Sequence, residues 1–492
     1  MYNMFSFFGR VDQLKLMDDL WESPRASFLV LYGRRRIGKT SLLTHWINQM
    51  GHKALYWVAE PTTPAKQLRS FSQTLYTFAN PTASLPSDDF SYASWRRAFE
   101  EVAGIAEGER IALFLDEFTY LLDAEPGIAG ILQNAWDHLL KNSQIFLAIS
   151  GSHLGMMERN VLSYQAPLYG RATAQIYLQP LPFGITKDFF PSYTPDERVV
   201  VYALFGGVPA YWMIFDPEQN ISSNIRRLLT HSLMRGEPRL LLHDFISSPN
   251  NYIGVLQAIA NGAHTQKEMV AYAGLQQGHI SQYLSILVDA RIVEKRLPVT
   301  ASPRSRQARY NIGDPYMRFY YRFISNHQSQ LDLGVEEQTI AEIKRHLVDF
   351  IGQHTWEELC REWVLRASAE GQLPFMVDQV GSVWKHKKYQ IDVVGINTRE
   401  KTLLLGECKW LQTIAGRSTL SALLEKVAQV VPTNGKWQVM LMGFSRQGWT
   451  SPAETFAEDV VSRPAKGDNW QIVDIKLLDL SQIDNDFTHW AS

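Results

Sequence analysis

The chain has 492 residues, of which 45% are hydrophobic and 20% are charged, and its net charge is −2. This length predicts roughly two to four domains, and the composition is that of a soluble globular protein. A net charge near zero excludes a global basic field, so binding of nucleic acid would depend on local basic patches. The two cysteines, Cys360 and Cys408, exclude a disulfide framework and a cysteine-based zinc site.

The first residues do not predict export or membrane insertion. MYNMFSFFGRVDQL lacks the basic segment and the long apolar segment of a signal peptide. No stretch reaches the roughly 18 uninterrupted apolar residues that a membrane helix needs. We therefore expect a cytoplasmic protein with no membrane partner.

A glycine-rich loop follows the first predicted strand. Residues 27–31 (SFLVL) form an apolar run typical of a buried parallel strand, and the apolar residues of LLTHWI (42–47) recur at helical spacing. Between them, GRRRIGKT (33–40) matches G-x-x-x-x-G-K-[ST] at every fixed position. Backbone amides of such a loop and of the helix N-terminus point at phosphates. The sequence therefore predicts an ATP site, with a chance match in a basic turn as the alternative.

The loop residues have distinct expected roles. Lys39 would reach the β- and γ-phosphates, and Thr40 would coordinate Mg²⁺. The three arginines add positive charge near the phosphates and receive no further role. The candidate ATP-binding set comprises Gly33, Arg34, Arg35, Arg36, Ile37, Gly38, Lys39, Thr40 and Ser41.

A later apolar strand ends in two acids. IALFLDEF (111–118) places Asp116 at the strand's end, where it would hold Mg²⁺ through water, and Glu117 next to it, where it would polarise the attacking water. Another apolar strand, residues 145–149, ends in SGS (150–152), which is either a turn or a polar contact beside the γ-phosphate. Together the two main motifs predict a nucleoside triphosphatase.

Three segments resemble the archaeal-type ATPases, a branch of the STAND NTPases within the AAA+ superfamily. FFGRVDQL (7–14) is similar to their N-terminal element, with Asp12 where the family usually has Glu. GRATAQIYLQPL (170–181) is similar to G-R-x-x-x-x-I-x-L-x-P-L, and FGGVPAY (205–211) matches the GGxPxY element, which in the family packs the lid helices onto the nucleotide base.

The resemblance implies further nucleotide contacts. Arg171 would face the nucleotide of its own or a neighbouring subunit, which implies a homo-oligomer; the alternative is an arginine that opens an edge strand. Arg10 and Pro209 join the candidate nucleotide site through the elements that contain them.

Residues 252–299 predict helix, turn, helix and β-ribbon, the order of a winged helix. TQKE (265–268) is a capping-box-like helix start, and Gly274 interrupts the chain before the second helix. The candidate recognition helix would expose Gln276, Gln277, His279, Ser281, Gln282 and Ser285, and the wing carries Arg291, Lys295, Arg296, Arg304, Arg306 and Arg309. Such a cluster suits contacts with nucleic-acid phosphates.

A second interpretation of this region stays open, because in STAND-type ATPases a winged helix often packs on the ATPase as a lever that senses the nucleotide state. The next segment, YNIGDPYMRFYYRF (310–323), also resembles the family, and its aromatic spacing predicts a buried helix that joins two domains.

The resemblance implies a DUF234-like C-terminal domain with a restriction-endonuclease-like fold. YQIDVVG (389–395) predicts a strand that carries Asp392, and TLLLGECKW (402–410) predicts a second strand that carries Glu407 and Lys409. Side chains two apart on a strand share a face, so a hairpin would bring Asp392 beside both. This is the D…E-x-K arrangement of the PD-(D/E)XK nucleases.

That chemistry requires these residue types. Asp392 and Glu407 would hold Mg²⁺, and Lys409 would orient the water or shield the growing negative charge. Glu357, on an amphipathic helix upstream, is the candidate third acid. The basic stretch WKHKK (384–388) suits a nucleic-acid backbone. The alternative is a solvated hairpin or a degenerate nuclease fold.

The predicted fold class is α/β. It comprises an AAA+-like P-loop NTPase core (1–195), a helical lid (196–245), a winged helix with a connecting helix (246–326) and a restriction-endonuclease-like α/β domain (327–492). The first functional hypothesis is an ATPase, with ATP and Mg²⁺ as cofactors, that controls a magnesium-dependent nuclease acting on nucleic acid, with DNA favoured, in defence or DNA processing. The second is an ATP-driven conformational switch or DNA-binding regulator whose C-terminal fold is inactive.

Overall fold

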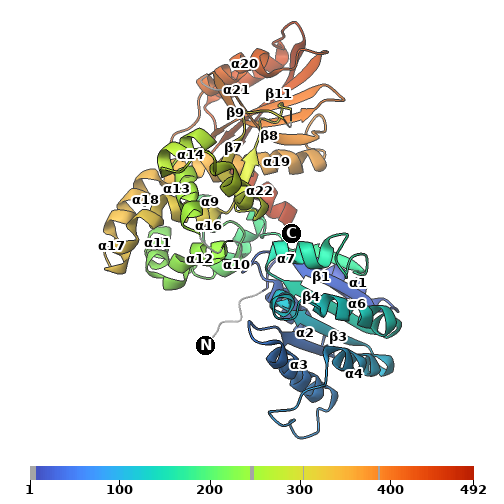
Figure 1. Cartoon of the computed structure of the whole chain (residues 1–492). Coiled ribbons are helices and arrows are strands. Elements are labelled where there is room, and N and C mark those ends of the chain that lie inside the picture. The colour runs from blue at the N-terminus through green and yellow to red at the C-terminus, as the bar shows by residue number, and fades with distance from the viewer. Residues whose placement is uncertain are drawn as a thin grey trace. The chain divides into compact units, whose positions relative to one another are not determined.

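The computed structural model describes residues 7–51, 53–243, 246, 249–302, 304–385 and 388–491 (Figure 1). The chain divides into two compact units, residues 1–181 with 208–211 and residues 182–207 with 212–492. Within the described residues, no helix is both long and apolar enough to cross a lipid bilayer. The finer division into four domains remains a prediction.

The first unit is built on a parallel five-stranded sheet with the order β2-β3-β4-β1-β5. Strands β3 and β4 are buried along their whole length, because helices cover both faces, and their sequences are therefore continuous apolar runs. The parallel strands predicted from these runs are confirmed. The strands are β1 (Ser27–Tyr32), β2 (Ala54–Val58), β3 (Ile111–Asp116), β4 (Ile145–Gly151) and β5 (Ala174–Tyr177).

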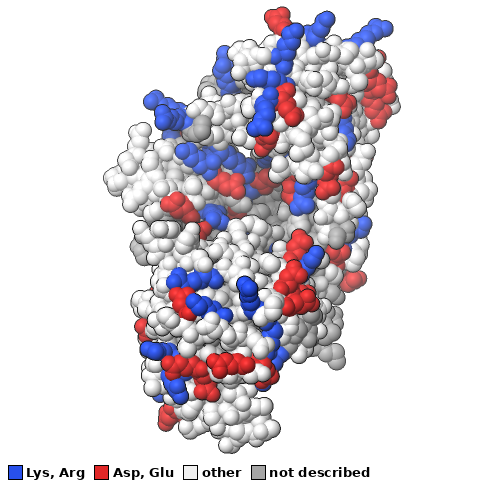
Figure 2. Space-filling view, turned by 90° about the vertical axis from the view of Figure 1, so that its right-hand side faces the viewer, with Lys and Arg blue, Asp and Glu red and all other residues white. Residues whose placement is uncertain are grey.

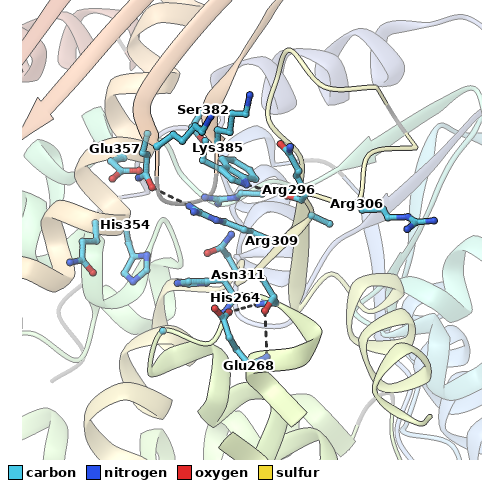
Figure 3. A pocket seen from close by; sticks show the side chains of 18 of the residues that line it. His264, Glu268, Arg296, Arg306, Arg309, Asn311, His354, Glu357, Ser382 and Lys385 are labelled. Atoms are coloured by element: carbon cyan, nitrogen blue, oxygen red, sulfur yellow. Dashed lines mark hydrogen bonds between the residues drawn. The ribbon is translucent and has the colours of Figure 1, made fainter. Parts of the chain in front are cut away.

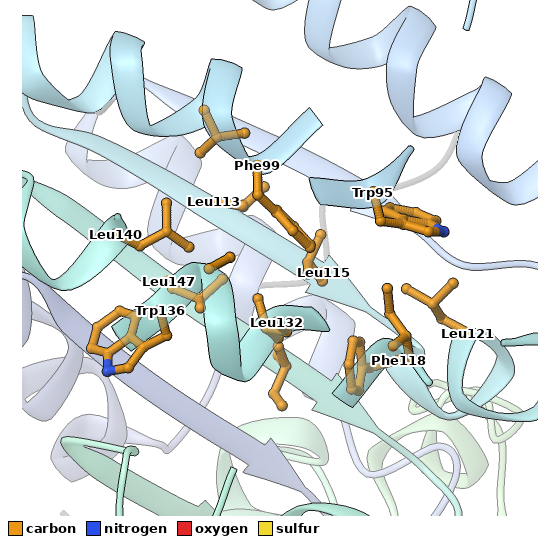
Figure 4. Close-up of a cluster of buried hydrophobic side chains, with 14 of the residues drawn as sticks. Trp95, Phe99, Leu113, Leu115, Phe118, Leu121, Leu132, Trp136, Leu140 and Leu147 are labelled. Carbon is orange, nitrogen blue, oxygen red and sulfur yellow. The ribbon is translucent and has the colours of Figure 1, made fainter. Parts of the chain in front are cut away.

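Helices cover the two faces of this sheet. On one face, Leu42, Leu43 and Trp46 of α2 pack against Phe114 and Phe146. The larger cluster on the other face is shown in Figure 4 and draws on helices α3 to α6. Full burial of each large apolar side chain contributes about 1.5–3 kcal/mol. The helices are α1 (Val11–Glu22), α2 (Lys39–Met50), α3 (Pro64–Ala79), α4 (Trp95–Gly108), α5 (Phe118–Ala124), α6 (Ile128–His138) and α7 (Leu154–Met157).

The second unit begins with a helical region. Its helices are α8 (Thr186–Phe189), α9 (Pro195–Phe205), α11 (Ile221–Thr230) and α12 (Ser232–His243), while the short α10 (Pro209–Trp212) lies at the junction of the two units. A complete capping box starts α9: the hydroxyl of Thr194 accepts from the backbone N–H of Glu197, whose carboxylate accepts from the backbone N–H of Thr194.

The predicted order of helix, turn, helix and ribbon is present next. Helices α13 (Asn250–Ala260), α14 (Gln266–Ala273) and α15 (Ile280–Asp289) precede the antiparallel pair β6 (Val293–Arg296) and β7 (Arg309–Ile312). The capping box of Thr265 and Glu268 is formed, and Gly274 ends α14 with a φ of 63°. The polar side chains predicted for the candidate recognition helix are exposed, but α15 begins at Ile280, so Gln276, Gln277 and His279 lie in the turn before it and Ser281, Gln282 and Ser285 lie on it.

Buried helical turns connect this region to the last domain. Tyr316 and Phe319 of α16 (Pro315–Phe319) are fully buried, and further helical turns continue to residue 327. The aromatic segment is therefore a buried connector, as predicted. Helices α17 (Gln328–Asp332), α18 (Glu337–Phe350) and α19 (Glu357–Ala369) follow.

A mixed five-stranded sheet completes the unit, with the order β12-β11-β10-β9-β8. The pairs β8–β9 and β9–β10 are antiparallel, whereas the pairs β10–β11 and β11–β12 are parallel. Helices α20 and α21 cover one face, and α19 packs on the other, where Trp363 contacts Phe444. The elements are β8 (Gln379–Lys385), β9 (Tyr389–Asn397), β10 (Thr402–Lys409), α20 (Arg417–Val430), β11 (Trp437–Ser445), α21 (Ser451–Ser462), β12 (Trp470–Asp479) and α22 (Leu480–Ala491).

Candidate functional site

The glycine loop lies where the sequence predicted it, between the end of β1 and the start of α2. Gly38 has a φ of 94°, in the left-handed region that favours glycine. A Cβ atom on Gly33 would lie 2.6 Å from the side chain of Ile37 and 2.7 Å from the carbonyl oxygen of Leu178. The loop backbone therefore has room for glycine only at this position.

Lys39 is held inside the loop. It is 5% exposed, and its Nζ donates to the carbonyl oxygens of Gly33 at 3.0 Å and Arg34 at 3.1 Å. Burial lowers the pKa of its ammonium, while the carboxylates of Glu117 and Asp116 oppose that shift. The ammonium thus lies across the loop, at the point where phosphate oxygens would enter.

Asp116 is the centre of a hydrogen-bond network at the end of β3. Its carboxylate accepts from the hydroxyls of Thr40 and Tyr56, both at 2.6 Å, from Ser150, and from the backbone N–H of Glu117 at 2.9 Å. Burial and this carboxylate raise the pKa of Tyr56. Neither contact was predicted from the sequence: Tyr56 received no role, and Ser150, which lies within β4, was expected in a turn or beside the γ-phosphate.

Glu117 adopts a left-handed backbone conformation, with a φ of 50°. Such a conformation is uncommon for a residue other than glycine and is a form of strain found at functional sites. The carboxylate accepts a hydrogen bond of 2.8 Å from the hydroxyl of Ser152. The two hydroxyls of the SGS segment therefore contact the two acids of the preceding motif.

The arginines of the loop contact aromatic residues. Arg34 donates to the hydroxyl of Tyr211 and Arg35 to that of Tyr120, each at 3.1 Å. Arg10 donates to the carbonyl oxygen of Ile37 at 3.1 Å, and burial lowers its pKa to about 10. The side chains of these arginines therefore support the loop.

The nearest ring atom of Pro209 would lie 3.8 Å from a Cβ on Gly38. This places Pro209 beside the loop.

Arg171 has a different environment from the one that the resemblance implies. Its guanidinium forms an ion pair with Asp137 on α6, with contacts of 2.7 and 3.0 Å, and donates to the carbonyl oxygens of Pro167 and Tyr169. The hydrogen bonds from Arg171 lower the pKa of Asp137. These contacts stabilise the segment before β5, and a nucleotide contact by Arg171 remains a prediction.

A second cluster lies in the mixed-sheet domain. Strands β9 and β10 are antiparallel, and the Oδ2 of Asp392 accepts from the backbone N–H of Cys408 at 3.1 Å. Lys409 donates to Glu407 at 2.9 Å. The hairpin thus brings Asp392, Glu407 and Lys409 together, as the sequence predicted.

Glu357 joins this cluster from the first turn of α19. Arg361, one turn along, donates to the Glu357 carboxylate at 3.1 Å and to the carbonyl oxygen of Asp392 at 2.9 Å. Burial, and then the charge of Asp392, raise the pKa of Glu357 to about 8. Burial and the charge of Glu407 likewise raise the pKa of Asp392. Burial and the neighbouring acids therefore both disfavour the charged forms of these two carboxyl groups.

Two cationic members of the cluster were not predicted. One is Arg361, and the other is Lys426 of α20, which donates to Glu407 at 3.1 Å and to the carbonyl oxygen of Gln390 at 3.0 Å. Both reach the cluster from helices outside the hairpin, at separations of 31 and 19 residues, so strand patterns give no signal for them.

The neighbouring Glu358 points to a different set of partners. Its carboxylate accepts from Arg296 of the winged-helix ribbon at 2.9 Å and from Arg318 of α16 at 3.0 Å. Although burial alone would raise its pKa, these two guanidinium groups lower it to about 2. Glu358 is thus a structural anchor beside the candidate acid Glu357.

Two of the basic side chains predicted to form the surface of the wing are engaged by other residues in the structure. Arg296 is engaged by Glu294 and Glu358, and Arg309 lies over Trp384, 4.7 Å from the ring centroid. Trp384 is 7% exposed, so its ring supports the wing. Of the predicted basic stretch 384–388, residues 386 and 387 lie outside the described residues.

Both sites have oxygen donors of the kind that Mg²⁺ prefers. In the first, the hydroxyl of Thr40 is adjacent to the buried carboxylate of Asp116. In the second, Asp392 and Glu407 are close enough that burial and the charge of Glu407 together raise the pKa of Asp392. Among the described residues, no group of three or more His, Cys, Asp or Glu side chains is arranged to hold a metal ion. One or two carboxylates suffice for Mg²⁺ when substrate phosphates and water supply the other ligands, so both donor sets fit this ion.

Comparisons with known proteins match both parts of the chain. The family model of an ATPase domain predominantly from Archaea matches residues 7–213, and that of DUF234, archaeal and bacterial proteins of unknown function, matches residues 320–420. An uncharacterized protein of Methanocaldococcus jannaschii is 31% identical over 412 residues, which cover 82% of this chain and 87% of that protein.

Among solved structures, a Walker-type ATPase of Pyrococcus abyssi matches with a TM-score of 0.50 and 20% identity, covering 64% of this chain and 96% of that chain. The STAND protein with a tetratricopeptide repeat sensor from Pyrococcus horikoshii matches with a TM-score of 0.29 and 14% identity, over 74% of this chain and 51% of that chain. The first match supports the P-loop ATPase fold of the parallel sheet, and the second is too distant to support an argument. The chain belongs to the family of ATPases found predominantly in Archaea, and its C-terminal part belongs to DUF234.

Proposed function

We propose that the first unit binds and hydrolyses Mg·ATP at residues 33–41, and that the second unit cleaves phosphodiester bonds of nucleic acid at the cluster around Asp392. In this proposal, the nucleotide state controls the cleavage, in defence against foreign DNA or in DNA processing. The single observation that carries the nuclease is the convergence of Glu357, Asp392, Glu407 and Lys409 from one helix and two strands.

In the ATPase site, the amides of the loop and of the start of α2 would bind the phosphates, and Lys39 would neutralise their charge. Thr40 and Asp116 would hold Mg²⁺, which when bound polarises the phosphates and neutralises the charge that develops on them. Glu117 would orient the attacking water, with Ser152 fixing its carboxylate. The network around Asp116 sets these groups in place before the nucleotide arrives.

In the nuclease site, Asp392 and Glu407 would hold Mg²⁺, which when bound lowers the pKa of water and stabilises charge on the phosphate. Lys409 would donate to a phosphate oxygen or orient the water. Arg361 keeps the backbone of Asp392 and the carboxylate of Glu357 in one arrangement. Glu357, which holds its proton up to about pH 8, would donate a hydrogen bond or release that proton to a leaving group at the edge of the site.

One observation favours a second candidate function, a switch with an inactive C-terminal domain. Both carboxylate oxygens of Glu407 contact lysines, Lys409 and Lys426, which compete with a cation for the same oxygens. In that case, the cluster would bind a phosphodiester without cleaving it.

The test uses the purified full chain. Phosphate release from ATP is measured for the wild type, Lys39→Ala, Glu117→Gln and the exposed control Lys66→Ala. Cutting of plasmid and single-stranded DNA is measured with Mg²⁺ or Mn²⁺, with and without ATP, for the wild type, Asp392→Ala and the exposed control Asp468→Ala. Loss of each activity in the site variants alone supports the proposal, whereas a wild type that cuts nothing under any condition favours the switch.

Self-association is part of the same proposal, because the resemblance allows Arg171 to act on a neighbouring subunit. Light scattering with and without a non-hydrolysable ATP analogue tests it. A chain that stays monomeric with the nucleotide bound would rule out this role, and the ion pair with Asp137 would then be the function of Arg171.

A further inference from the structure

A cleft of about 790 Å³ lies in the second unit between the winged helix and the mixed sheet (Figure 3). The winged helix lines it from the start of α14 and from the segment before and within β7. The mixed-sheet domain lines it from β8, from the start of β9 and from α19. Glu357 and Arg361 are on its wall, so the cleft reaches the carboxylate cluster.

The wing is fixed to the sheet along this cleft. The backbone N–H of Val299 donates to the carbonyl oxygen of Ser382 at 3.0 Å. The indole of Trp384 donates to the carbonyl oxygen of Gln307 at 3.1 Å, and Arg309, stacked on that indole, donates to Gln390 at 3.1 Å. These contacts make the two walls one continuous surface.

Four cations of the cleft have no ion pair with a carboxylate among the described residues: Arg309, which Trp384 and Gln390 hold, and three others. Arg306 comes from the wing and Lys385 and Lys388 come from the sheet, and all three are exposed. The other two basic side chains named above, Arg296 and Arg361, are neutralised by glutamates. On the face that Figure 2 shows, basic and acidic side chains are interspersed. The exposed cations of the cleft are therefore a local group next to the carboxylate cluster and not part of a large basic surface.

We propose that this cleft binds the sugar–phosphate backbone of a single nucleic-acid strand, with Arg306, Lys385 and Lys388 contacting phosphates on the path to the carboxylate cluster. The inference rests on the proposed nuclease function and names its substrate class. The volume is in the range of ligand pockets, which suits a few nucleotides of one strand rather than a duplex. Cations that track a backbone are the usual basis of single-strand binding.

Binding is measured apart from cleavage. The full chain is titrated onto fluorescent single-stranded and hairpin DNA and RNA in EDTA, and the anisotropy is followed at several salt concentrations. The test variant is Arg306→Ala/Lys385→Ala/Lys388→Ala. The control is Lys436→Ala/Arg463→Ala/Lys466→Ala, which removes the same charge from exposed positions of the same domain that do not line the cleft.

The expected result is that the test variant binds single strands at least roughly tenfold more weakly, and that the slope of log affinity against log salt falls by about 2, since each lost phosphate contact on a single strand removes about 0.7. The control should bind like the wild type. Equal loss in both triple variants, or binding by the test variant as tight as that of the wild type, would overturn the inference. Tighter binding of the hairpin than of the single strand would overturn the choice of substrate.

Two further variants distinguish binding in the cleft from binding on the recognition helix and from cleavage. If Gln277→Ala/Gln282→Ala, at exposed positions in the turn before α15 and on α15, weakens binding and the cleft variant does not, the site is at that helix and the inference is wrong. Asp392→Ala should retain single-strand binding. A wild type that binds strands through the cleft and never cuts them would contradict the proposed nuclease while leaving the cleft assignment intact.

Discussion

The hydroxyl of Thr40 lies 2.6 Å from the Oδ2 of Asp116, and the hydroxyl of Tyr56 donates to the same oxygen at the same distance. The first contact joins the start of α2 to the end of β3, two positions that are 76 residues apart. The second adds the neighbouring strand β2. A helix and a neighbouring strand therefore hold the carboxylate at the end of β3 in a single orientation, as the proposed Mg²⁺ site requires.

Tyr56→Phe tests whether the fixed orientation of the Asp116 carboxylate matters for ATP hydrolysis. A hydrogen bond to a charged acceptor contributes about 1.5–3 kcal/mol, but two hydroxyls and one amide would still hold Asp116. We therefore expect kcat for ATP hydrolysis to fall about three- to tenfold, with a smaller change in ATP affinity by calorimetry. Tyr76→Phe on α3, whose ring packs on Phe90, is the matched control. An unchanged kcat in Tyr56→Phe would mean that this tyrosine does not position the acid.

Gly33→Ala should prevent ATP binding, because the added methyl group would lie 2.7 Å from the backbone oxygen of Leu178. Overpacking of this kind costs about 1–3 kcal/mol, and relief by loop movement would displace the phosphate-binding amides. Calorimetry should show at least roughly tenfold weaker ATP binding.

Gly130→Ala provides the contrast to Gly33→Ala. No atom lies within 4 Å of the added methyl group, and the residue is inside α6. Alanine should raise the stability by up to about 1 kcal/mol there and leave ATP binding unchanged. Equal ATP affinities in the two variants would show that the loop tolerates a side chain at Gly33.

The strands and loops of the two sites were predictable because their signals are local. A buried parallel strand has an apolar sequence of its own, and an acid at its end, such as Asp116, is visible in that sequence. The spacing of two between Glu407 and Lys409 places them on one face of β10 wherever the strand lies. The capping box of Thr265 and Glu268 is equally local, and the structure forms it.

Contacts made by tertiary packing were not predictable. Tyr56 is one of several aromatic residues in an ordinary strand, and only the sheet order β2-β3-β4-β1-β5 brings it beside Asp116. Lys426 reaches Glu407 because α20 crosses the sheet at that point. The guanidinium of Arg171 is engaged by the carboxylate of Asp137, 34 residues earlier, a contact with no signal in the sequence; its nucleotide contact stays a prediction. Long side chains select partners that a single sequence does not reveal.

The buried ion pair of Arg198 and Asp484 joins α9 to the last helix, α22. The two groups lie 2.6 Å apart and each side chain is 4% exposed. Arg198→Met would leave the buried carboxylate unpaired, so we expect a loss of about 3–5 kcal/mol in the free energy of unfolding. Urea unfolding measures it. The double variant Arg198→Met/Asp484→Leu should regain most of this loss; if it is no more stable than the single variant, the cost comes from lost packing.

The adjacent residues Glu357 and Glu358 should affect stability with opposite dependence on pH. Glu358 has its pKa lowered to about 2, because Arg318 and Arg296 outweigh its burial. Between its ordinary value of 4.5 and about 2, the unfolded chain binds a proton that the native chain does not. The contribution of Glu358 is therefore fully present above pH 4.5 and is lost as the pH falls. Glu358→Gln should lower the free energy of unfolding at pH 7 by about 2–4 kcal/mol.

Glu357 has its pKa raised to about 8 by burial and by the charge of Asp392. Here the native chain holds a proton that the unfolded chain has lost, so between pH 4.5 and 8 the stability falls as the pH rises. Glu357→Gln removes that loss. The difference in free energy of unfolding between this variant and the wild type should therefore grow by about 3–4 kcal/mol in favour of the variant from pH 5 to pH 8. Urea unfolding of both variants at the two pH values measures this, and a gain that does not grow with pH would show that the Glu357 carboxyl ionises normally in the folded protein.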